Sequence, residues 1–353
     1  MSRDQTLYSE LLVAAAIGNC SVSDIAKVRH SDIQAFERES ERRGNIHSDK
    51  SGLELTAAGT KIRDWILRGH PGELPSIEWT GDEKLGSVET IARDLTIPNL
   101  DLSISVKEDA QLFQNPSPVK VFQKWPSGDF SPSRDDDWFL RVAETELNSY
   151  FIACGGQTKT GERNVRDYYE KFKGKDEVGK SRRKAFTEHV KNLHSDRSTN
   201  VLDAYQLFCR KVSEESAKKF NDSIQSQKSK AGNQTSIVTH LEKLFSYFFK
   251  VGDRPYILCG TESGKAFALQ IQDLDTWKVN FRLKNVYAEP IIAGQPEVLL
   301  NFEFEEISSM VNFKYGIKCE VRWSHGKFCG NPESKLYKHE NWKYADLPWA
   351  TNL

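Results

Sequence analysis

Apolar residues recur every three or four positions through most of the first seventy residues, which predicts helices. The first such stretch, residues 7–17, ends at Gly18 and Asn19. Three later stretches each follow a residue that commonly caps a helix, namely Ser21, Ser31 or Thr56. Residues 45–56 differ, because they read as two short extended segments around the turn residues Ser48, Asp49, Ser51 and Gly52. The pattern therefore predicts three helices, a hairpin and a closing helix.

The rest of the chain changes pattern twice. Residues 88–97 and 100–107 read as strands joined by a Pro98-Asn99 turn, whereas residues 137–250 return to helical spacing. Strand patterns come back after residue 250, and GTESGK at 260–265 reads as a turn between two of them. We therefore expect an α/β fold in which one central sheet carries a large helical insertion at about 137–250. The turn-rich joint at 70–75 predicts a boundary between a domain of residues 1–72 and one of residues 73–353.

Composition narrows the class of protein. The 353 residues carry 49 Lys and Arg against 50 Asp and Glu, so any surface for a polyanion must be local. Hydrophobic residues make up 38% of the chain, enough for a packed core. No apolar run reaches the roughly 18 residues that cross a bilayer, and the first residues do not resemble a secretory signal, so we expect no membrane contact and a cytoplasmic protein. Six cysteines without a C-x-x-C pair predict free thiols.

The hairpin at 88–107 carries a polar face with the residue types that phosphodiester hydrolysis uses. A two-residue loop would place Asp94 opposite Ser103, with Ser105 and Lys107 on the same face. A carboxylate there could bind Mg²⁺, while the lysine positions or activates the attacking water. Residues 73–109 hold nine acidic and three basic residues, an excess that a cation would relieve. The alternative is a half-buried hairpin whose polar face is merely solvated.

The segment RDLTIPNLDLSISVKED resembles the core of PD-(D/E)XK nucleases, in which an Asp on one strand precedes a (D/E)-x-K tripeptide on the next. Here the tripeptide is Ser105-Val106-Lys107, as in the S-x-K variant of HaeIII-type restriction endonucleases. The resemblance implies a mixed sheet of restriction-endonuclease type, with Asp94 as metal ligand, Lys107 as catalytic lysine and Ser105 in the second acidic position. Another carboxylate would then complete the site, and the candidates are Glu89, Glu78, Asp101 and, more remotely, Glu10.

The first seventy residues resemble a winged helix-turn-helix domain, in which LELTAAGTKI would run from the wing into the last helix. The third helix of such domains usually enters the major groove of DNA. Here that helix carries Asp32, Glu37, Glu39 and Glu41, whose charges repel phosphate. Contact with DNA and packing against the rest of the chain therefore both remain open for this unit.

Two further segments concentrate positive charge. Residues 311–345 hold seven Lys and Arg against three Glu, which predicts a DNA-contacting surface or, alternatively, an ordinary charged loop. The residues there that we expect to contact DNA are Arg322, Ser324, His325, Lys327, Asn331 and Lys335. The basic residues between 180 and 191 fit a solvated helix face better than a phosphate contact.

These features lead to two hypotheses. The first is a Mg²⁺-dependent type II restriction endonuclease that cuts double-stranded DNA, and that acts as a homodimer because a symmetric site needs two active sites. The second is a noncatalytic winged-helix DNA-binding regulator whose larger domain senses a ligand or partner. The sequence leaves open the recognition site, the cleavage position and the requirement for modified or unmodified DNA.

Overall fold

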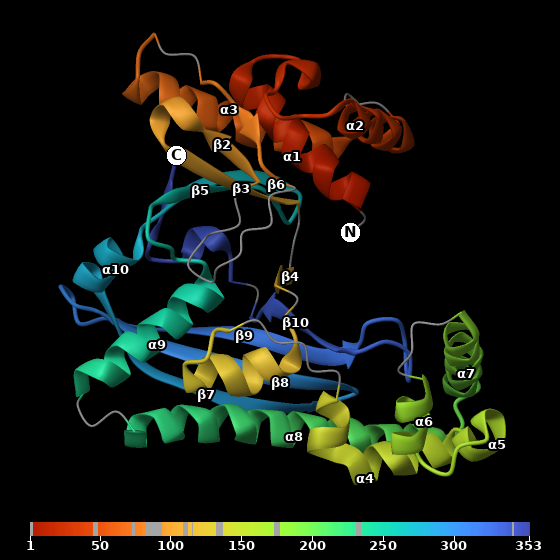
Figure 1. Cartoon of the computed structure of the whole chain (residues 1–353). Coiled ribbons are helices and arrows are strands. Elements are labelled where there is room, and N and C mark those ends of the chain that lie inside the picture. The colour runs from red at the N-terminus through yellow and green to blue at the C-terminus, as the bar shows by residue number, and fades with distance from the viewer. Residues whose placement is uncertain are drawn as a thin grey trace.

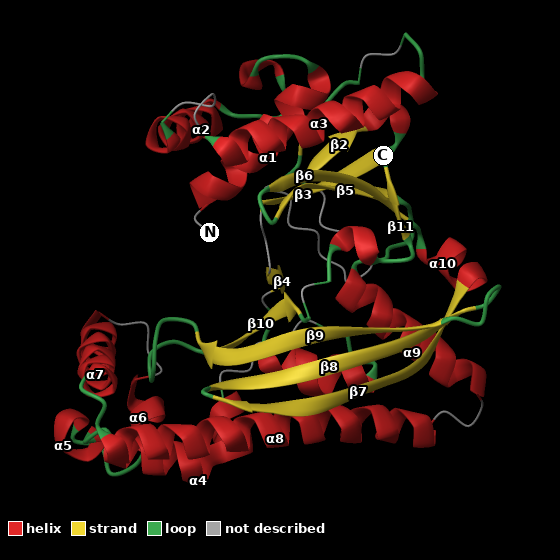
Figure 2. Cartoon of the chain, turned by 180° about the vertical axis from the view of Figure 1, so that it is seen from behind, coloured by secondary structure: helices red, strands yellow, loops and turns green. Residues whose placement is uncertain are grey.

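The chain forms two lobes, each built around its own β-sheet (Figures 1 and 2). This computed structural model describes residues 3–44, 49–72, 75–81, 94–108, 112–114, 116–131, 137–172, 177–230, 234–340 and 342–353. The expected α/β composition is confirmed, and the expected order of strands, helices and strands is also found. The prediction of one central sheet is wrong, because the strands divide between two sheets.

The first lobe has a six-stranded mixed sheet with the strand order β1-β2-β3-β5-β6-β11. Strands β1 to β3 are antiparallel neighbours, and β5 lies parallel to β3. The strands are β1 (Glu78–Trp79), β2 (Leu95–Ile97), β3 (Leu102–Glu108), β5 (Tyr256–Glu262), β6 (Lys265–Ile271) and β11 (Ala350–Asn352). Ser263 and Gly264, both at positive φ, form the β5–β6 turn, so the predicted turn in GTESGK is confirmed.

Three N-terminal helices cover one face of this sheet: α1 (Arg3–Gly18), α2 (His30–Arg43) and α3 (Lys50–Gly69). Their apolar side chains share one hydrophobic core with Leu95, Ile104 and Ile257 of the sheet. The helices α1 to α3, which lie within the predicted domain of residues 1–72, pack together with strands from residues 77–106 and 257–268. Packing on the rest of the chain, one of the two alternatives for this unit, is therefore what the helices do.

The predicted wing is wrong. Residues 50–69 form the single helix α3, which begins where the side chain of Asp49 accepts a hydrogen bond from the backbone N–H of Ser51 (3.1 Å). Gly59, which weakens a helix pattern in sequence, serves helix packing. A Cβ there would lie 2.7 Å from the carbonyl oxygen of Val13, so glycine lets α3 approach α1 closely.

The second lobe has a five-stranded antiparallel sheet with the order β4-β10-β9-β8-β7. Its strands are β4 (Leu112–Gln114), β7 (Phe281–Ala293), β8 (Gln295–Glu306), β9 (Asn312–Trp323) and β10 (Pro332–Lys338). The long helix α8 runs along β7 and β8. The helices of this lobe are α4 (Trp138–Ala153), α5 (Gly156–Thr160), α6 (Val165–Phe172), α7 (Glu177–Ser195), α8 (Thr199–Lys230) and α9 (Gln234–Phe249), and α10 (Leu274–Asn280) precedes β7.

The helical insertion predicted at 137–250 is confirmed, and it belongs to the second lobe. All six cysteines are free, as predicted, and five of them are buried. No helix in the described part of the chain is both long and apolar enough to cross a membrane.

Candidate active site

The β2–β3 hairpin has a longer loop than the sequence suggested. Pro98–Leu100 form a 3₁₀ turn and Asp101 adopts a left-handed conformation (φ 49°), so Ile97 pairs with Leu102 rather than with Leu100. The predicted register is therefore wrong by two residues. Since a shift of two preserves the face of each side chain, the predicted polar face survives. Asp94 moves from a position opposite Ser103 to one beside Ser105.

Asp94, Ser105 and Lys107 meet on this face. Asp94 Oδ2 accepts hydrogen bonds from the Ser105 hydroxyl (3.0 Å) and from the backbone N–H of Val106 (2.7 Å). The Lys107 ammonium lies 4.0 Å from the same carboxylate oxygen. The side chains of Asp94 and Lys107 keep 15% and 29% of their surface exposed, so both remain accessible. The structure therefore places a fixed carboxylate and an accessible ammonium side by side.

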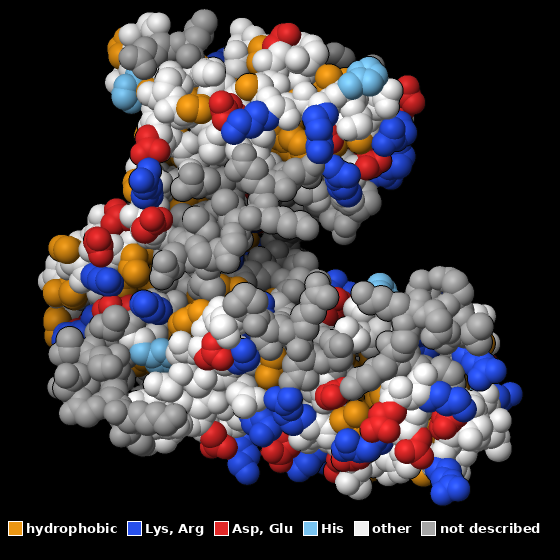
Figure 3. Space-filling view, viewed as in Figure 1, with side chains coloured by type: hydrophobic (Ala, Val, Ile, Leu, Met, Phe, Trp, Pro, Cys, Tyr) orange, Lys and Arg blue, Asp and Glu red, His pale blue; other side chains and the backbone are white. Residues whose placement is uncertain are grey.

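This polar face turns toward the second lobe. Ile104 and Val106 point to the N-terminal helices, so the alternating residues Ser105 and Lys107 point the other way. Leu258 pairs with Ser105 and belongs to the core of the second lobe. The space-filling view shows the molecule hollowed between the two lobes (Figure 3).

A second lysine, Lys250 of the second lobe, interacts electrostatically with Lys107. Lys250 directly follows α9 in a left-handed conformation (φ 59°), and its ammonium lies 5.1 Å from the centre of the Tyr247 ring. Burial, followed by the positive charge of Lys107, lowers the pKa of Lys250 to about 8. No spacing motif in the sequence singled out Lys250.

The additional carboxylates differ in their positions. Glu89 lies outside the described residues. Glu78 lies on the same face of the sheet as Asp94, but it forms an ion pair with Lys27 (2.8 Å). Glu10 is buried in the helix layer and accepts a hydrogen bond from the indole N–H of Trp79 (2.7 Å). Asp101 is exposed in the hairpin loop and pairs with Arg254 (2.8 Å).

The donors present fit Mg²⁺ in part. Mg²⁺ typically takes one or two carboxylates and fills its other positions with water and substrate phosphate oxygens. Asp94 supplies one carboxylate, and the Ser105 hydroxyl lies beside it. Among the described residues there is no group of three or more His, Cys, Asp or Glu side chains that could hold a metal ion. Asp94 is thus the residue that would hold Mg²⁺, together with water and phosphate.

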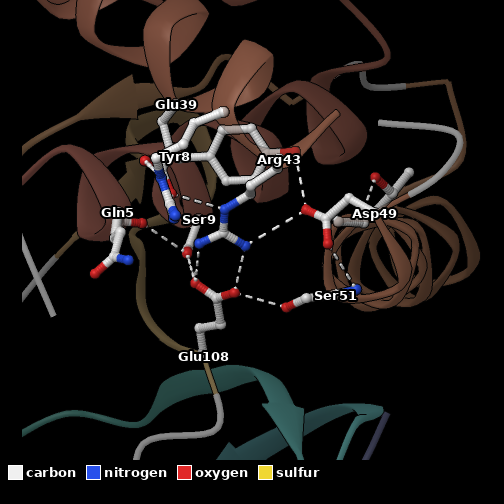
Figure 4. Close-up of polar contacts among 11 residues, drawn as sticks. Gln5, Tyr8, Ser9, Glu39, Arg43, Asp49, Ser51 and Glu108 are labelled. Carbon is white, nitrogen blue, oxygen red and sulfur yellow. Dashed lines mark hydrogen bonds and ion pairs between the residues drawn. The ribbon is translucent and has the colours of Figure 1, made fainter. Parts of the chain in front are cut away.

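A buried ionic network fixes the end of the strand that carries Lys107 (Figure 4). Glu108 points to the helix side, where its two carboxylate oxygens accept hydrogen bonds from Arg43 Nη1 (2.6 Å) and Nη2 (3.1 Å). Ser9 and Ser51 donate further hydrogen bonds to Glu108 (2.5 and 2.6 Å). Burial alone would raise the pKa of Glu108, but these hydrogen bonds lower it below its ordinary value. The network ties β3 to α1, α2 and α3, and sequence analysis did not anticipate it.

Arg43 is the centre of this network, since it also pairs with Glu39 (2.9 Å) and Asp49 (3.4 Å). We expect Arg43→Met to lower the free energy of unfolding by about 3 kcal/mol, because it leaves three largely buried carboxylates without their shared cation. Urea denaturation followed by circular dichroism measures this change.

Arg38→Met is the matched control for Arg43→Met. Arg38 lies on the same helix, is 61% exposed and, among the residues that the structure describes, forms an ion pair with the exposed Asp4 alone, so its loss is expected to change the unfolding free energy by less than about 1 kcal/mol. Equal effects of the two substitutions would contradict the central role of Arg43.

The residues predicted to contact DNA lie on β9, β10 and their connecting turn at 324–331. His325 and Asn331 are exposed, and Ser324 and Lys335 are half-buried. Arg322 forms an ion pair with Glu333 on the neighbouring strand (3.0 Å). Other basic residues of 311–345 are also paired, for example Lys318 with Glu297 (3.0 Å). Three of the seven basic residues of this segment, Lys318, Arg322 and Lys338, are thus paired with carboxylates in the described part of the chain.

Lys327 does not extend from the turn as an exposed side chain. Its ammonium lies 4.6 Å from the centre of the Tyr205 ring of α8, and its carbonyl oxygen accepts a hydrogen bond from Thr187 of α7 (2.9 Å). Burial lowers the pKa of Lys327 below its ordinary value. The prediction that Lys327 reaches a DNA groove therefore conflicts with its packing against the helices of the second lobe.

His194, at the end of α7, gives this packing a pH dependence. Its Nε2 pairs with the hydroxyl of Tyr150 (2.8 Å), and burial, together with the charge of Lys327, lowers its pKa to about 4. The unfolded chain takes up this proton near pH 6.5, so stability should fall as the pH drops from about 6.5 to about 4.

We expect wild type to lose about 1 kcal/mol more than His194→Gln between pH 7 and pH 5, a value reduced for the partial exposure of the ring. The urea midpoint at both pH values measures the difference. Parallel pH profiles for the two proteins would show that His194 is not responsible.

Comparison of the chain with models of known protein families, with curated proteins and with solved structures found no match.

Proposed function

We propose that this protein is a Mg²⁺-dependent endonuclease of double-stranded DNA, with an active site of the PD-(D/E)XK type in its D…S-x-K variant. The observation that carries the proposal is the cluster of Asp94, Ser105 and Lys107 on one face of a mixed sheet, where Asp94 and Lys107 remain partly exposed. The motif strands β2 and β3 are antiparallel neighbours, as the resemblance implies. The alternative interpretation is a hairpin whose polar face is merely solvated. Such a face would not require Lys107 to lie 4.0 Å from Asp94, whose carboxylate already accepts two hydrogen bonds.

Each residue of the cluster has a role in this proposal. Asp94 would hold Mg²⁺, and Ser105 and the backbone N–H of Val106 orient its carboxylate. Bound Mg²⁺ supplies charge neutralisation and lowers the pKa of a coordinated water. Lys107 positions the attacking water beside the phosphate, and Lys250 adds a second positive charge that favours the pentacovalent transition state. Attack by water breaks one P–O ester bond, and the leaving oxygen takes up a proton.

We propose that DNA approaches between the lobes, because the polar face of β2 and β3 points away from the N-terminal helices and toward the second lobe. Two copies of the chain would cut the two strands of a symmetric site, as expected for a type II restriction endonuclease. His325, Asn331 and Lys335 remain proposed DNA contacts on the second lobe. The alternative function, a winged-helix regulator, depended mainly on the predicted wing. Residues 50–56 of that wing form part of helix α3 instead.

A plasmid cleavage assay tests the proposal. The protein should convert supercoiled DNA to nicked or linear DNA with Mg²⁺ and should not do so with EDTA. Asp94→Asn should reduce the rate by about 10³-fold, because the amide cannot replace the charged metal ligand.

The control for Asp94→Asn is Asp101→Asn, which removes an exposed carboxylate from the same hairpin and should leave cleavage within twofold of wild type. Cleavage that persists in EDTA, or an Asp94→Asn protein as active as Asp101→Asn, would reject this active site.

A further inference from the structure

An apolar patch lies at one end of the second sheet, where α10 meets the turn between β8 and β9 (Figure 1). Among the residues that the structure describes, nine large hydrophobic residues are exposed, and four of them lie at this end. They are Val279, Ile307, Met310 and Val311, which are 74%, 43%, 60% and 47% exposed. Hydrophobic side chains are visible on this flank in the space-filling view, toward the left of Figure 3. These four residues form the α10 patch.

Backbone hydrogen bonds hold the α10 patch together. The N–H of Ile307 donates to the carbonyl oxygen of Asn280 (2.8 Å), which places the turn beside Val279. Within the turn, the N–H of Met310 donates to the carbonyl oxygen of Glu306 (2.9 Å). The helix and the turn therefore present one contiguous apolar surface.

The residue types in this turn differ from those that an exposed turn normally has. Met310 has a left-handed conformation (φ 58°), in which an exposed turn usually has Gly or Asn. Ile307 and Val311 are apolar and β-branched, whereas turns in contact with water are usually polar. Apolar side chains at these positions contribute to stability only when another surface covers them.

The charges around the α10 patch are balanced. Residues 274–284 and 305–311 together hold three basic and three acidic residues, so their net charge is zero. Glu305 pairs with Lys284 (3.0 Å) and with Arg282, and Asp275 pairs with Lys278 (3.6 Å). DNA and anionic membranes are attracted by an excess of positive charge, which this surface lacks. A second copy of the chain, in contrast, would meet no net repulsion here.

The size of the α10 patch suits the apolar centre of a dimer interface. Judged by their exposed fractions, the four residues expose on the order of 400 Å². A standard interface buries about 800 Å² on each partner, and somewhat over half of that area is apolar. In a dimer with two-fold symmetry each copy contributes the same surface, so apolar residues meet apolar residues. Asp275, whose side chain is 94% exposed, lies one helical turn before Val279 and supplies a polar rim.

We propose that the α10 patch is the surface through which two copies of this chain form a symmetric dimer. Val279 and Met310 are the most exposed of the four residues and would be buried at its centre. The proposed endonuclease also requires two copies. The surface assigned to the dimer, however, follows from exposure and charge on the second lobe and does not rest on hydrolysis at Asp94.

Sedimentation velocity of the full-length protein, without DNA or Mg²⁺, tests this interface. Wild type should sediment as a dimer at about 50 µM and dissociate on dilution. Val279→Glu/Met310→Glu should raise the dissociation constant of the dimer at least about 100-fold, because a symmetric dimer would then bury four carboxylates close together. Circular dichroism confirms that this variant is folded.

Leu53→Glu/Leu207→Glu is the matched control. It makes the same change at two exposed leucines outside the patch, on α3 and α8, which are 47% and 56% exposed. Its dissociation constant should stay within about twofold of that of wild type.

Two results would overturn the interface: a wild-type protein that is monomeric at about 50 µM, or a patch variant that dimerises as strongly as the control variant. A monomeric wild type that cosediments with phosphatidylcholine vesicles would assign the α10 patch to a membrane surface instead. A dimer that never cuts DNA would reject the endonuclease and leave this interface standing, and DNA cleavage by a monomeric wild type would do the reverse.

Discussion

Replacing Lys107 by alanine is expected to slow DNA cleavage by about 10³-fold while binding of the same DNA in EDTA stays within a few-fold of wild type. The ammonium lies 4.0 Å from the proposed metal ligand Asp94, so its loss removes the charge that the proposed mechanism places at the reacting phosphate. A single contact out of many to the DNA backbone contributes much less to binding than to this step. Single-turnover cleavage rates and anisotropy measure the two effects separately.

Lys265→Ala is the matched control for Lys107→Ala, because Lys265 is an exposed lysine on β6 of the same sheet. Its rate should equal that of wild type within twofold. If Lys107→Ala cuts as fast as Lys265→Ala, the lysine of the S-x-K tripeptide has no part in the reaction.

Gly260→Ala is expected to cost about 4 kcal/mol of stability or more, which leaves little folded protein. Gly260 pairs with Lys107 at φ 135°, and a Cβ there would lie 1.8 Å from the Lys107 carbonyl oxygen. The strands β3 and β5 would have to separate at Lys107, the proposed catalytic lysine. Urea denaturation and the yield of folded protein report this loss.

The β5–β6 turn provides the comparison for Gly260→Ala. Gly264 also has a positive φ (67°), but a Cβ there meets nothing within 4 Å. Gly264→Ala should therefore cost only about 1 kcal/mol, from backbone strain alone. Similar losses for the two substitutions would show that contact with Lys107 is not what requires glycine at residue 260.

The candidate site was predictable because it depends on alternation along two strands. The loop length was misjudged, yet an error of two residues keeps Asp94, Ser105 and Lys107 on one face. The helical insertion was predictable for a similar reason, since helical spacing is a local property. Alternation could not predict the electrostatic interaction of Lys107 with Lys250, because Lys250 lies in the other lobe and about 140 residues further along the chain.

The errors come from contacts between distant residues. Ser48, Asp49, Ser51 and Gly52 read as turn residues, but Asp49 caps a helix, and the helix that follows packs closely on α1. The basic residues between 311 and 345 were predicted to form a DNA-contacting surface because acidic partners such as Glu297 lie on another strand, outside this segment. The ionic network around Arg43 could not be predicted for the same reason, because its partner Glu108 lies 65 positions further along the chain. Local sequence carries propensity and periodicity, whereas charge pairing is decided by tertiary structure.

The parallel pairing of Ile104 with Ile257 has a consequence for the order in which the chain is made. During synthesis β3 leaves the ribosome long before its neighbour β5, and nearly the whole helical part of the second lobe is translated in between. Until β5 is synthesised, β3 lacks the strand that pairs with it at Lys107. Contacts between residues so far apart in the sequence also form slowly. A partly made chain would therefore carry Asp94 and Lys107 without the completed sheet, so the proposed activity would arise only late in translation.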